Sequence, residues 1–141
     1  MPRSRPPSLR SFLIADQVFQ QASGKWCIIG VFDRIWATSF PARHPSLGLF
    51  IVLGDAVGAY DVKIEFRDSG DRVLNTIEGI KMEVQSPLAT VNFGLQTSDL
   101  PLPSPGRYFF KLFFNGELAP TDIPLEASRA EKQGGGPAGP A

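Results

Sequence analysis

The sequence predicts an all-β protein: an antiparallel β-sandwich of about eight strands, immunoglobulin-like, with little or no helix. Three observations support this. From Tyr60 to Arg67, apolar and charged residues alternate with a period of two. An Asn115-Gly116 step joins two strand-like runs. Clusters rich in Gly, Pro, Ser and Asp recur along the chain at intervals that suit strands and leave almost no room for helices.

The expected strands begin with Phe12–Gln20, whose apolar run is interrupted by Asp16. Trp26–Trp36 and Leu47–Leu53 carry apolar residues on both faces, and so does Tyr108–Phe114 near the end. Continuous apolar runs of this kind are typical of strands in the middle of a fold. We therefore expect these three runs to form its centre.

Tyr60–Arg67 is the clearest half-buried strand, because its apolar side chains fall on one face and its charges on the other. Arg72–Val84 follows after a turn, and its Gly79 suggests a bulge. Leu88–Gln96 alternates in the same way. These runs supply the next three strands.

The last two strands form a predicted hairpin. Asn115-Gly116 accepts positive φ at both central positions of a type I′ turn, so Tyr108–Phe114 should fold back onto the segment after Glu117. Gly106 stands two residues before Tyr108 at the entry to a penultimate strand, as in a tyrosine corner, where the phenol bonds to upstream backbone. A tyrosine that merely starts a half-buried strand is the other interpretation.

The chain of 141 residues fits one domain, expected over residues 11–126. Residues 1–10 are predicted to form a flexible, basic, Pro-rich tail, and residues 127–141 a flexible Gly/Pro-rich tail. Neither segment has the composition to bury a core.

Several motifs resemble a small bacterial family of uncharacterised β-rich single-domain proteins, a domain of unknown function. They are the segments of residues 12–17, 24–32, 105–112 and 115–118. The resemblance covers roughly residues 11 to 120. It implies one compact β-rich domain and no catalytic or binding residue.

Composition excludes some classes of function. Basic and acidic residues are equal in number, 14 each, so the domain has no basic face of the size that nucleic acid needs. No run is long and apolar enough for a membrane span. The single cysteine, Cys27, excludes an internal disulfide and favours a reducing compartment. We expect a soluble cytoplasmic protein that binds neither nucleic acid nor membrane.

No catalytic, cofactor or metal site is predicted. His44 is the only histidine and is expected in a loop, while Cys27 lies in an apolar strand where a thiol is usually inert. The Asp residues on either side of Tyr60–Arg67 lie at opposite ends of that strand and suit turns better than calcium. Asp16 is expected to face water on an edge strand or to pair with Arg34.

Surplus aromatic residues indicate either a partner face formed by Trp36, Phe40, Phe109 and Phe113 or an apolar surface that long loops simply cover. We take the partner face as the prediction. The protein should then be a non-enzymatic module that binds another protein or a copy of itself. The alternative is a small-ligand or hydrolytic pocket near Trp36, Phe40, Arg43 and His44. A third class, nucleic-acid binding, would use the arginines from Arg3 to Arg10.

Overall fold

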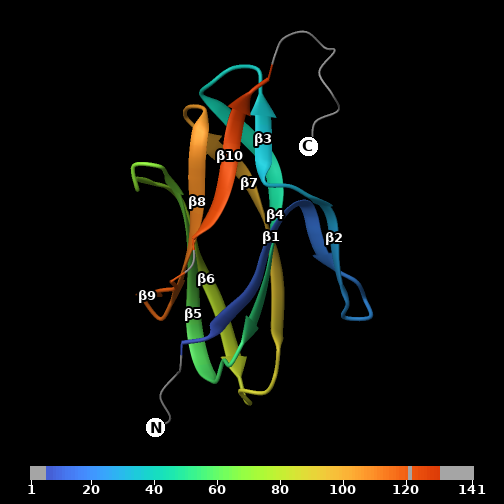
Figure 1. Cartoon of the computed structure of the whole chain (residues 1–141). Coiled ribbons are helices and arrows are strands. Elements are labelled where there is room, and N and C mark those ends of the chain that lie inside the picture. The colour runs from blue at the N-terminus through green and yellow to red at the C-terminus, as the bar shows by residue number, and fades with distance from the viewer. Residues whose placement is uncertain (1–5, 121, 131–141) are drawn as a thin grey trace.

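The computed structural model describes residues 6–120 and 122–130, which form two β-sheets facing each other and contain no helix (Figure 1). The prediction of an all-β, two-sheet protein is confirmed. The described residues form ten strands where about eight were predicted, and in chain order they are β1(Ser8–Gln20), β2(Trp26–Val31), β3(Arg34–Ala37), β4(Ala42–Gly54), β5(Gly58–Asp68), β6(Val73–Val84), β7(Val91–Leu102), β8(Gly106–Phe114), β9(Glu117–Leu118) and β10(Ile123–Arg129).

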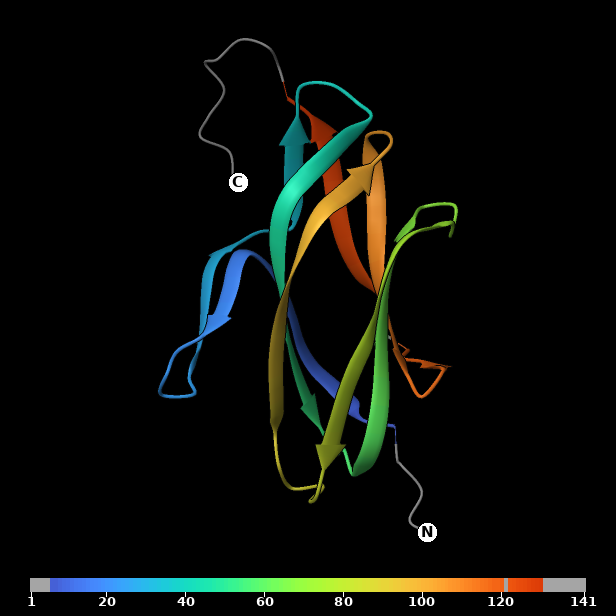
Figure 2. The same cartoon turned by 180° about the vertical axis from the view of Figure 1, so that it is seen from behind.

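The smaller sheet has the order β2-β1-β4-β7, and all its pairings are antiparallel. The larger sheet has the order β3-β10-β8-β5-β6, with β9 paired to β8. Its pairings are antiparallel except that β3 runs parallel to β10. The two sheets lie face to face along most of their length (Figures 1 and 2).

The core lies between the inner faces of the two sheets. The alternation predicted for Tyr60–Arg67 is confirmed, since Tyr60, Val62, Ile64 and Phe66 of β5 are all buried. Phe66 stacks on Tyr108 of β8 with ring centroids 5.2 Å apart. Alternate residues of β4 and β8 fill the rest of this layer, namely Leu47, Leu49, Ile51 and Leu53 with Phe110, Leu112 and Phe114.

The predicted hairpin after β8 is present. Asn115 and Gly116 have φ of 53° and 83°, as a type I′ turn requires, and β9 pairs back onto Phe113 and Phe114. The Tyr108 phenol donates a hydrogen bond to the Ser104 carbonyl and accepts one from the Ser104 N–H. The tyrosine-corner contact is therefore formed.

The expected single strand over Trp26–Trp36 is wrong. The chain leaves the smaller sheet at Val31 and enters the larger one at Arg34, so the run divides into β2 and β3. Gly30 has φ of 73°, a left-handed conformation near the end of β2, and Phe32 and Asp33 carry the chain between the sheets. Leu88 was expected to begin a strand, but β7 begins at Val91 and Leu88 is exposed.

The expected domain boundaries are also corrected. β1 begins at Ser8, inside the predicted N-terminal tail, and β10 runs on to Arg129, past the predicted boundary at residue 126. Ala127 is buried and pairs with Ile35 of β3, which explains why the strand continues. Residues 1–5 and 131–141 of the predicted tails lie outside the described residues.

Over the residues that the structure describes, no helix is long and apolar enough to cross a membrane.

Candidate functional site

A two-stranded ribbon leaves the smaller sheet (Figures 1 and 2). β1 pairs with β4 only from Ser8 to Ala15, whereas from Ala15 to Gln20 it pairs with β2. We call residues 16–31, which include the turn between the two strands, the ribbon. On the side that β4 vacates, the Gln96 amide donates to the Asp16 carbonyl at 2.9 Å and accepts from the Val18 N–H at 3.1 Å. One side chain of β7 thus replaces the missing strand contacts.

Two glycines make room for the ribbon against the outer face of the smaller sheet. A Cβ at Gly48 would lie 2.6 Å from a methyl of Val18, and one at Gly94 would lie 2.4 Å from the other methyl and 2.9 Å from the Trp26 ring. Val18 and Trp26 accordingly pack with Phe50 into a second, small core. One face of the ribbon is buried in this way.

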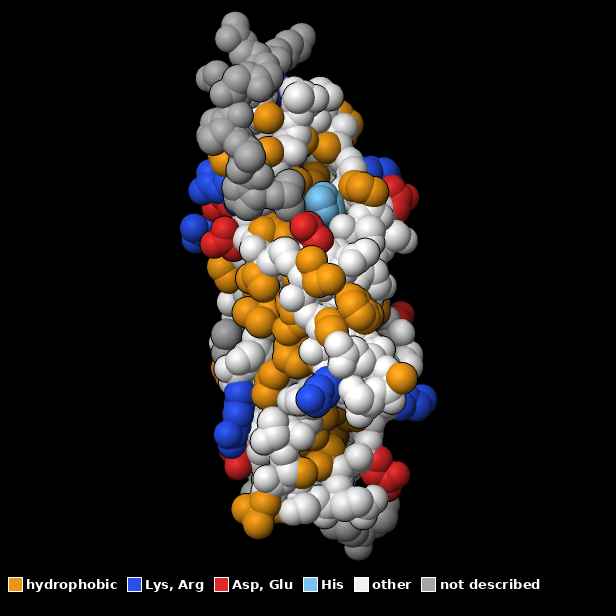
Figure 3. All heavy atoms as spheres, turned by 90° about the vertical axis from the view of Figure 1, so that its right-hand side faces the viewer, with side chains coloured by type: hydrophobic (Ala, Val, Ile, Leu, Met, Phe, Trp, Pro, Cys, Tyr) orange, Lys and Arg blue, Asp and Glu red, His pale blue; other side chains and the backbone are white. Residues whose placement is uncertain are grey.

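The other face of the ribbon is apolar and exposed. Phe19 is 44% exposed and Ile29 is 50% exposed, and both alternate with the residues of the small core. Val31, two residues beyond Ile29, is 58% exposed. On the side from which the ribbon projects, hydrophobic side chains form a long band with most charges at its margins (Figure 3). We call the surface of Phe19, Ile29 and Val31 the ribbon face.

A hollow of about 400 Å³, the side groove, adjoins the ribbon face where β1 passes β10. Val31 belongs to both surfaces. The groove is mainly apolar and is lined by Phe12, Leu13, Ile14, Val31, Phe32, Asp33, Ile123 and Pro124. Phe32 and Asp33, which carry the chain from β2 in one sheet to β3 in the other, form part of its wall.

The groove exposes an unpaired stretch of β1. The Ile14 carbonyl accepts a hydrogen bond from the Phe32 N–H at 2.9 Å, so the backbone groups of Ile14 point away from β4. Because these groups alternate along a strand, the N–H and C=O of Phe12 point the same way, into the groove. No described strand pairs with this edge of β1 before Ala15.

The opposite wall cannot pair in the same manner. β10 pairs with β3 only from Glu126 onward, and the Glu126 N–H donates to the Asp33 carbonyl at 2.9 Å. Two residues earlier, the corresponding position is Pro124, which has no N–H to donate. Proline at a free strand edge is a common means of preventing unwanted pairing. The groove therefore offers one edge that can pair and one that is blocked.

A smaller polar hollow of about 140 Å³ continues from the groove over Arg34, Arg107 and Glu126. Arg107 forms an ion pair with Glu126 at 3.3 Å, while Arg34 donates to the Ser128 hydroxyl and lies over the Trp36 ring. Asp33 and Pro124 line both hollows. The groove thus has an apolar floor and a charged end.

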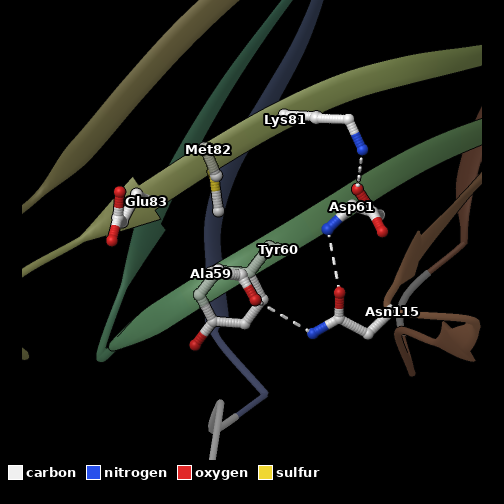
Figure 4. A pocket seen from close by; sticks show the side chains of 7 residues that line it. All are labelled: Ala59, Tyr60, Asp61, Lys81, Met82, Glu83 and Asn115. Carbon is white, nitrogen blue, oxygen red and sulfur yellow. Dashed lines mark hydrogen bonds and ion pairs between the residues drawn. The ribbon is translucent and has the colours of Figure 1, made fainter.

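Another hollow, of about 410 Å³, lies over β5 and β6 (Figure 4). Its polar groups bind one another: Lys81 contacts Asp61 at 2.6 Å, and the Asn115 amide accepts from the Asp61 N–H and donates to the Ala59 carbonyl. These bonds hold the turn after β8 against β5. Lys81, Asp61 and Asn115 in this hollow thus form contacts that stabilise the fold.

The predicted partner face is only partly assembled. Trp36, Phe109 and Phe113 lie on the outer face of the larger sheet, because Trp36 pairs with Ser128 while Phe109 and Phe113 alternate with buried residues of β8. Phe113 is half-buried under Lys63, whose ammonium is 4.5 Å from its ring centroid. Trp36 is the most exposed of the set at 41%.

Phe40, the fourth residue of that set, packs against the main core under the Arg129 guanidinium. The pattern of the sequence did not predict the ribbon face. Ile29 and Val31 lie in a run that looks central, and only Gly30 and Asp33 signalled the break within it.

The alternative pocket near Trp36, Phe40, Arg43 and His44 does not coincide with any of the three hollows described above. His44 lies in β4 and not in a loop, opposite Leu100 of β7, and its ring is 5.9 Å from that of Phe32. Burial lowers the pKa of His44 below its ordinary value, against the opposing effect of Asp16. Arg43 pairs with Asp99 at 3.3 Å.

The expected pairing of Asp16 with Arg34 is not formed, since Arg34 donates to the Ser128 hydroxyl. At the half-buried Asp16, β1 pairs with β2 on one side, and on the side that β4 no longer reaches the Gln96 amide donates to the Asp16 carbonyl. The Asp16 carboxylate occupies the space that a side chain at Gly30 would fill, 2.3 Å from the position of a Cβ there. The Cys27 thiol accepts a hydrogen bond from the Gln21 amide. Among the described residues, no three His, Cys, Asp or Glu side chains come together as metal ligands.

A model described as a family of unknown function, DUF6941, matches residues 10–128. The search of curated proteins gave no significant match.

Proposed function

The chain belongs to this family of unknown function, and from the geometry of the side groove we propose that it is a non-enzymatic protein-interaction module that binds an extended polypeptide segment. The observation that carries the proposal is the edge of β1 before Ala15, which no described strand pairs and which borders an apolar hollow lined by Phe12. An incoming strand pairs with this edge and adds to the smaller sheet.

The shape and chemistry of the groove support this mode of binding. Main-chain hydrogen bonds to Phe12 supply affinity, and alternate side chains of the added segment rest on Leu13, Val31 and Phe32. The blocked edge at Pro124 leaves a single pairing partner and so fixes which wall the segment joins. Arg34 and Asp33 at the charged end favour a segment with a polar residue there.

The strand order supports assignment of the sandwich to the immunoglobulin-like class. β1-β4-β7 faces β5-β8-β10, as strands A-B-E face C-F-G in that class. Tyr108 begins the strand that corresponds to F, where the tyrosine corner occurs, and it bonds to Ser104. Sandwiches of this class commonly serve as cell-surface binding domains, but the lone cysteine, Cys27, leads us to propose a cytoplasmic location.

A library of short random peptides displayed on phage tests the proposal. Selected peptides should be apolar at alternate positions, and when bound they should slow hydrogen exchange at the Phe12 N–H. Val31→Glu should abolish binding, because it places a charge in the groove at a residue that is already exposed. Val73→Glu is the matched control, since Val73 is 45% exposed on β6 and does not line the groove.

Peptides that bind the Val31→Glu variant as well as the parent would contradict the proposal. So would peptides that protect amides only in other strands.

A further inference from the structure

The ribbon face carries a second inference, which rests on Phe19 and Ile29, although Val31 and Asp33 at its margin also line the groove. Phe19 and Ile29 do not line the side groove, yet they are among the most exposed large apolar side chains of the described chain. They lie on the face of the ribbon opposite to the small core of Val18, Trp26 and Phe50, so no other part of the described structure covers them. A surface of this kind on a small domain commonly marks an interaction site.

The charges at the two ends of the ribbon indicate what covers it. Lys25 precedes β2 and Asp33 follows it, and both side chains are exposed. Neither forms an ion pair with another described residue. Between them, β2 from Trp26 to Val31 contains no charge and no proline, the two features with which natural edge strands most simply avoid association.

This pattern is self-complementary. When two ribbons pack face to face with their strands antiparallel, a two-fold axis relates them and the apolar centres meet. The same axis brings Lys25 of each copy to the Asp33 end of the other, so that both ion pairs form together. The reverse, parallel arrangement would place like charges together at each end.

We infer that the domain associates with a second copy of itself through the ribbon face, with Phe19 and Ile29 at the centre and Lys25–Asp33 pairs at both ends. The resulting dimer leaves the outer face of the larger sheet free, since Trp36, Phe109 and Phe113 belong to the other sheet.

Sedimentation velocity over a wide range of concentration measures this association. The parent protein should show a reversible monomer–dimer equilibrium. Ile29→Lys should raise the dissociation constant by about tenfold or more, because it replaces a central apolar contact with a charge. Leu88→Lys is the matched control: Leu88 is more exposed still, at 93%, but lies outside the ribbon, so this variant should dimerise like the parent.

A charge exchange tests the arrangement itself. Lys25→Asp and Asp33→Lys should each raise the dissociation constant by about 5- to 30-fold, since each variant opposes like charges at both ends. An equimolar mixture of the two variants should recover the parent affinity, because the mixed dimer pairs Asp with Lys at both ends. Recovery in the mixture would not follow from a merely structural effect of either substitution.

A protein that stays monomeric at every concentration overturns the inference. So does a dimer that Ile29→Lys leaves unchanged, or a mixture that fails to recover affinity. Because Val31 and Asp33 also line the groove, the peptide selection is repeated with the Ile29→Lys variant, whose substituted residue does not line it. Peptide binding that persists in this variant separates the fate of the groove from that of the dimer.

Discussion

Glu65 is a buried carboxylate on the outer face of β5, with 9% of its surface exposed. Arg67 donates to it at 2.9 Å through Nε, and Lys63 approaches it at 3.3 Å. Burial by itself raises the pKa of Glu65. The hydrogen bonds and charges of Arg67 and Lys63 together lower it by more than burial raises it, so the net pKa is below the ordinary value of 4.5. The ionised form is thus favoured by the fold.

The direction of this pKa shift determines how the stability of the fold depends on pH. A carboxyl whose pKa is lowered on folding contributes stability that is present above its ordinary pKa and is lost as the pH falls through the folded value. The free energy of unfolding should therefore decrease as the pH falls below about 4.5, and Glu65→Gln should flatten that decrease. Urea titrations at several pH values measure it. Glu78→Gln, on an exposed residue of β6, should keep the slope of the parent.

Phe66 and Arg67 are adjacent in β5 and face opposite ways. Phe66→Ala should lower the free energy of unfolding by about 3 to 5 kcal/mol, because it opens a cavity beside Tyr108 and Phe110. The sequence alone predicts little effect for Arg67→Ala, since charged residues of an alternating strand face water. The structure changes that expectation, because the Arg67 side chain is only 17% exposed and bonds Glu65 and Asp71.

Arg67→Ala should accordingly lower the free energy of unfolding by about 1 to 3 kcal/mol, through the lost partner of a buried carboxylate. Lys81→Ala is the comparison, since its ion pair with Asp61 is exposed and should contribute less than about 1 kcal/mol. Equal, small losses for Arg67 and Lys81 in urea denaturation would show that Glu65 is not stabilised in the way described.

At the scale of the elements, the ribbon packs closely against two glycines of neighbouring strands, Gly48 of β4 and Gly94 of β7. Gly94→Ala would place a methyl 2.4 Å from Val18 and 2.9 Å from the Trp26 ring, so the ribbon must move away from β4 and β7. Trp26 fluorescence should shift to the red while the far-ultraviolet β spectrum remains. Gly70→Ala is the control, since its nearest contact would be 3.5 Å from a carboxylate oxygen of Asp68. An unshifted spectrum for Gly94→Ala would mean that the ribbon does not rest on this glycine.

The alternating strand shows what the sequence could establish about an element. In Tyr60–Arg67 the pattern has a definite phase, so it predicted both the strand and its buried face. Asn115-Gly116 and Gly106-x-Tyr108 were equally informative, because each motif requires a particular local backbone geometry. Local geometry is the part of a fold that a short sequence can specify.

Trp26–Trp36 shows where such reasoning stops. A run that is apolar on both faces has no phase, so it cannot reveal which sheet it joins or where it breaks. The division into β2 and β3 depends on which distant strands are available, β1 for one and β10 for the other. The ribbon face was missed for this reason, and the partner face that includes Phe109 and Phe113 was predicted without the Lys63 and Arg67 side chains that lie over the Phe113 ring.

At the scale of the whole molecule, β10 connects β3 to the rest of the larger sheet. β10 lies between β8 and β3, and its last residues, Glu126 to Arg129, make all the pairings to β3. Truncation after Glu126, at the boundary that the sequence predicts, should therefore lower the melting temperature by at least about 5 °C. Truncation after Ala130 keeps these pairings and should leave the melting temperature unchanged. Calorimetry of the two truncated proteins compares them directly, and equal melting temperatures would show that β3 does not depend on β10.

The ribbon begins and ends at neighbouring points, because Ala15 and Val31 are cross-strand partners. The fifteen or so residues between them thus form a hairpin whose two ends lie side by side in the smaller sheet. Such a segment can be lengthened, shortened or exchanged for another hairpin without re-routing β1, the crossover at Phe32 or the strands that follow. The two-sheet scaffold can in this way stay the same while the apolar surface of the ribbon is changed within a single stretch of chain.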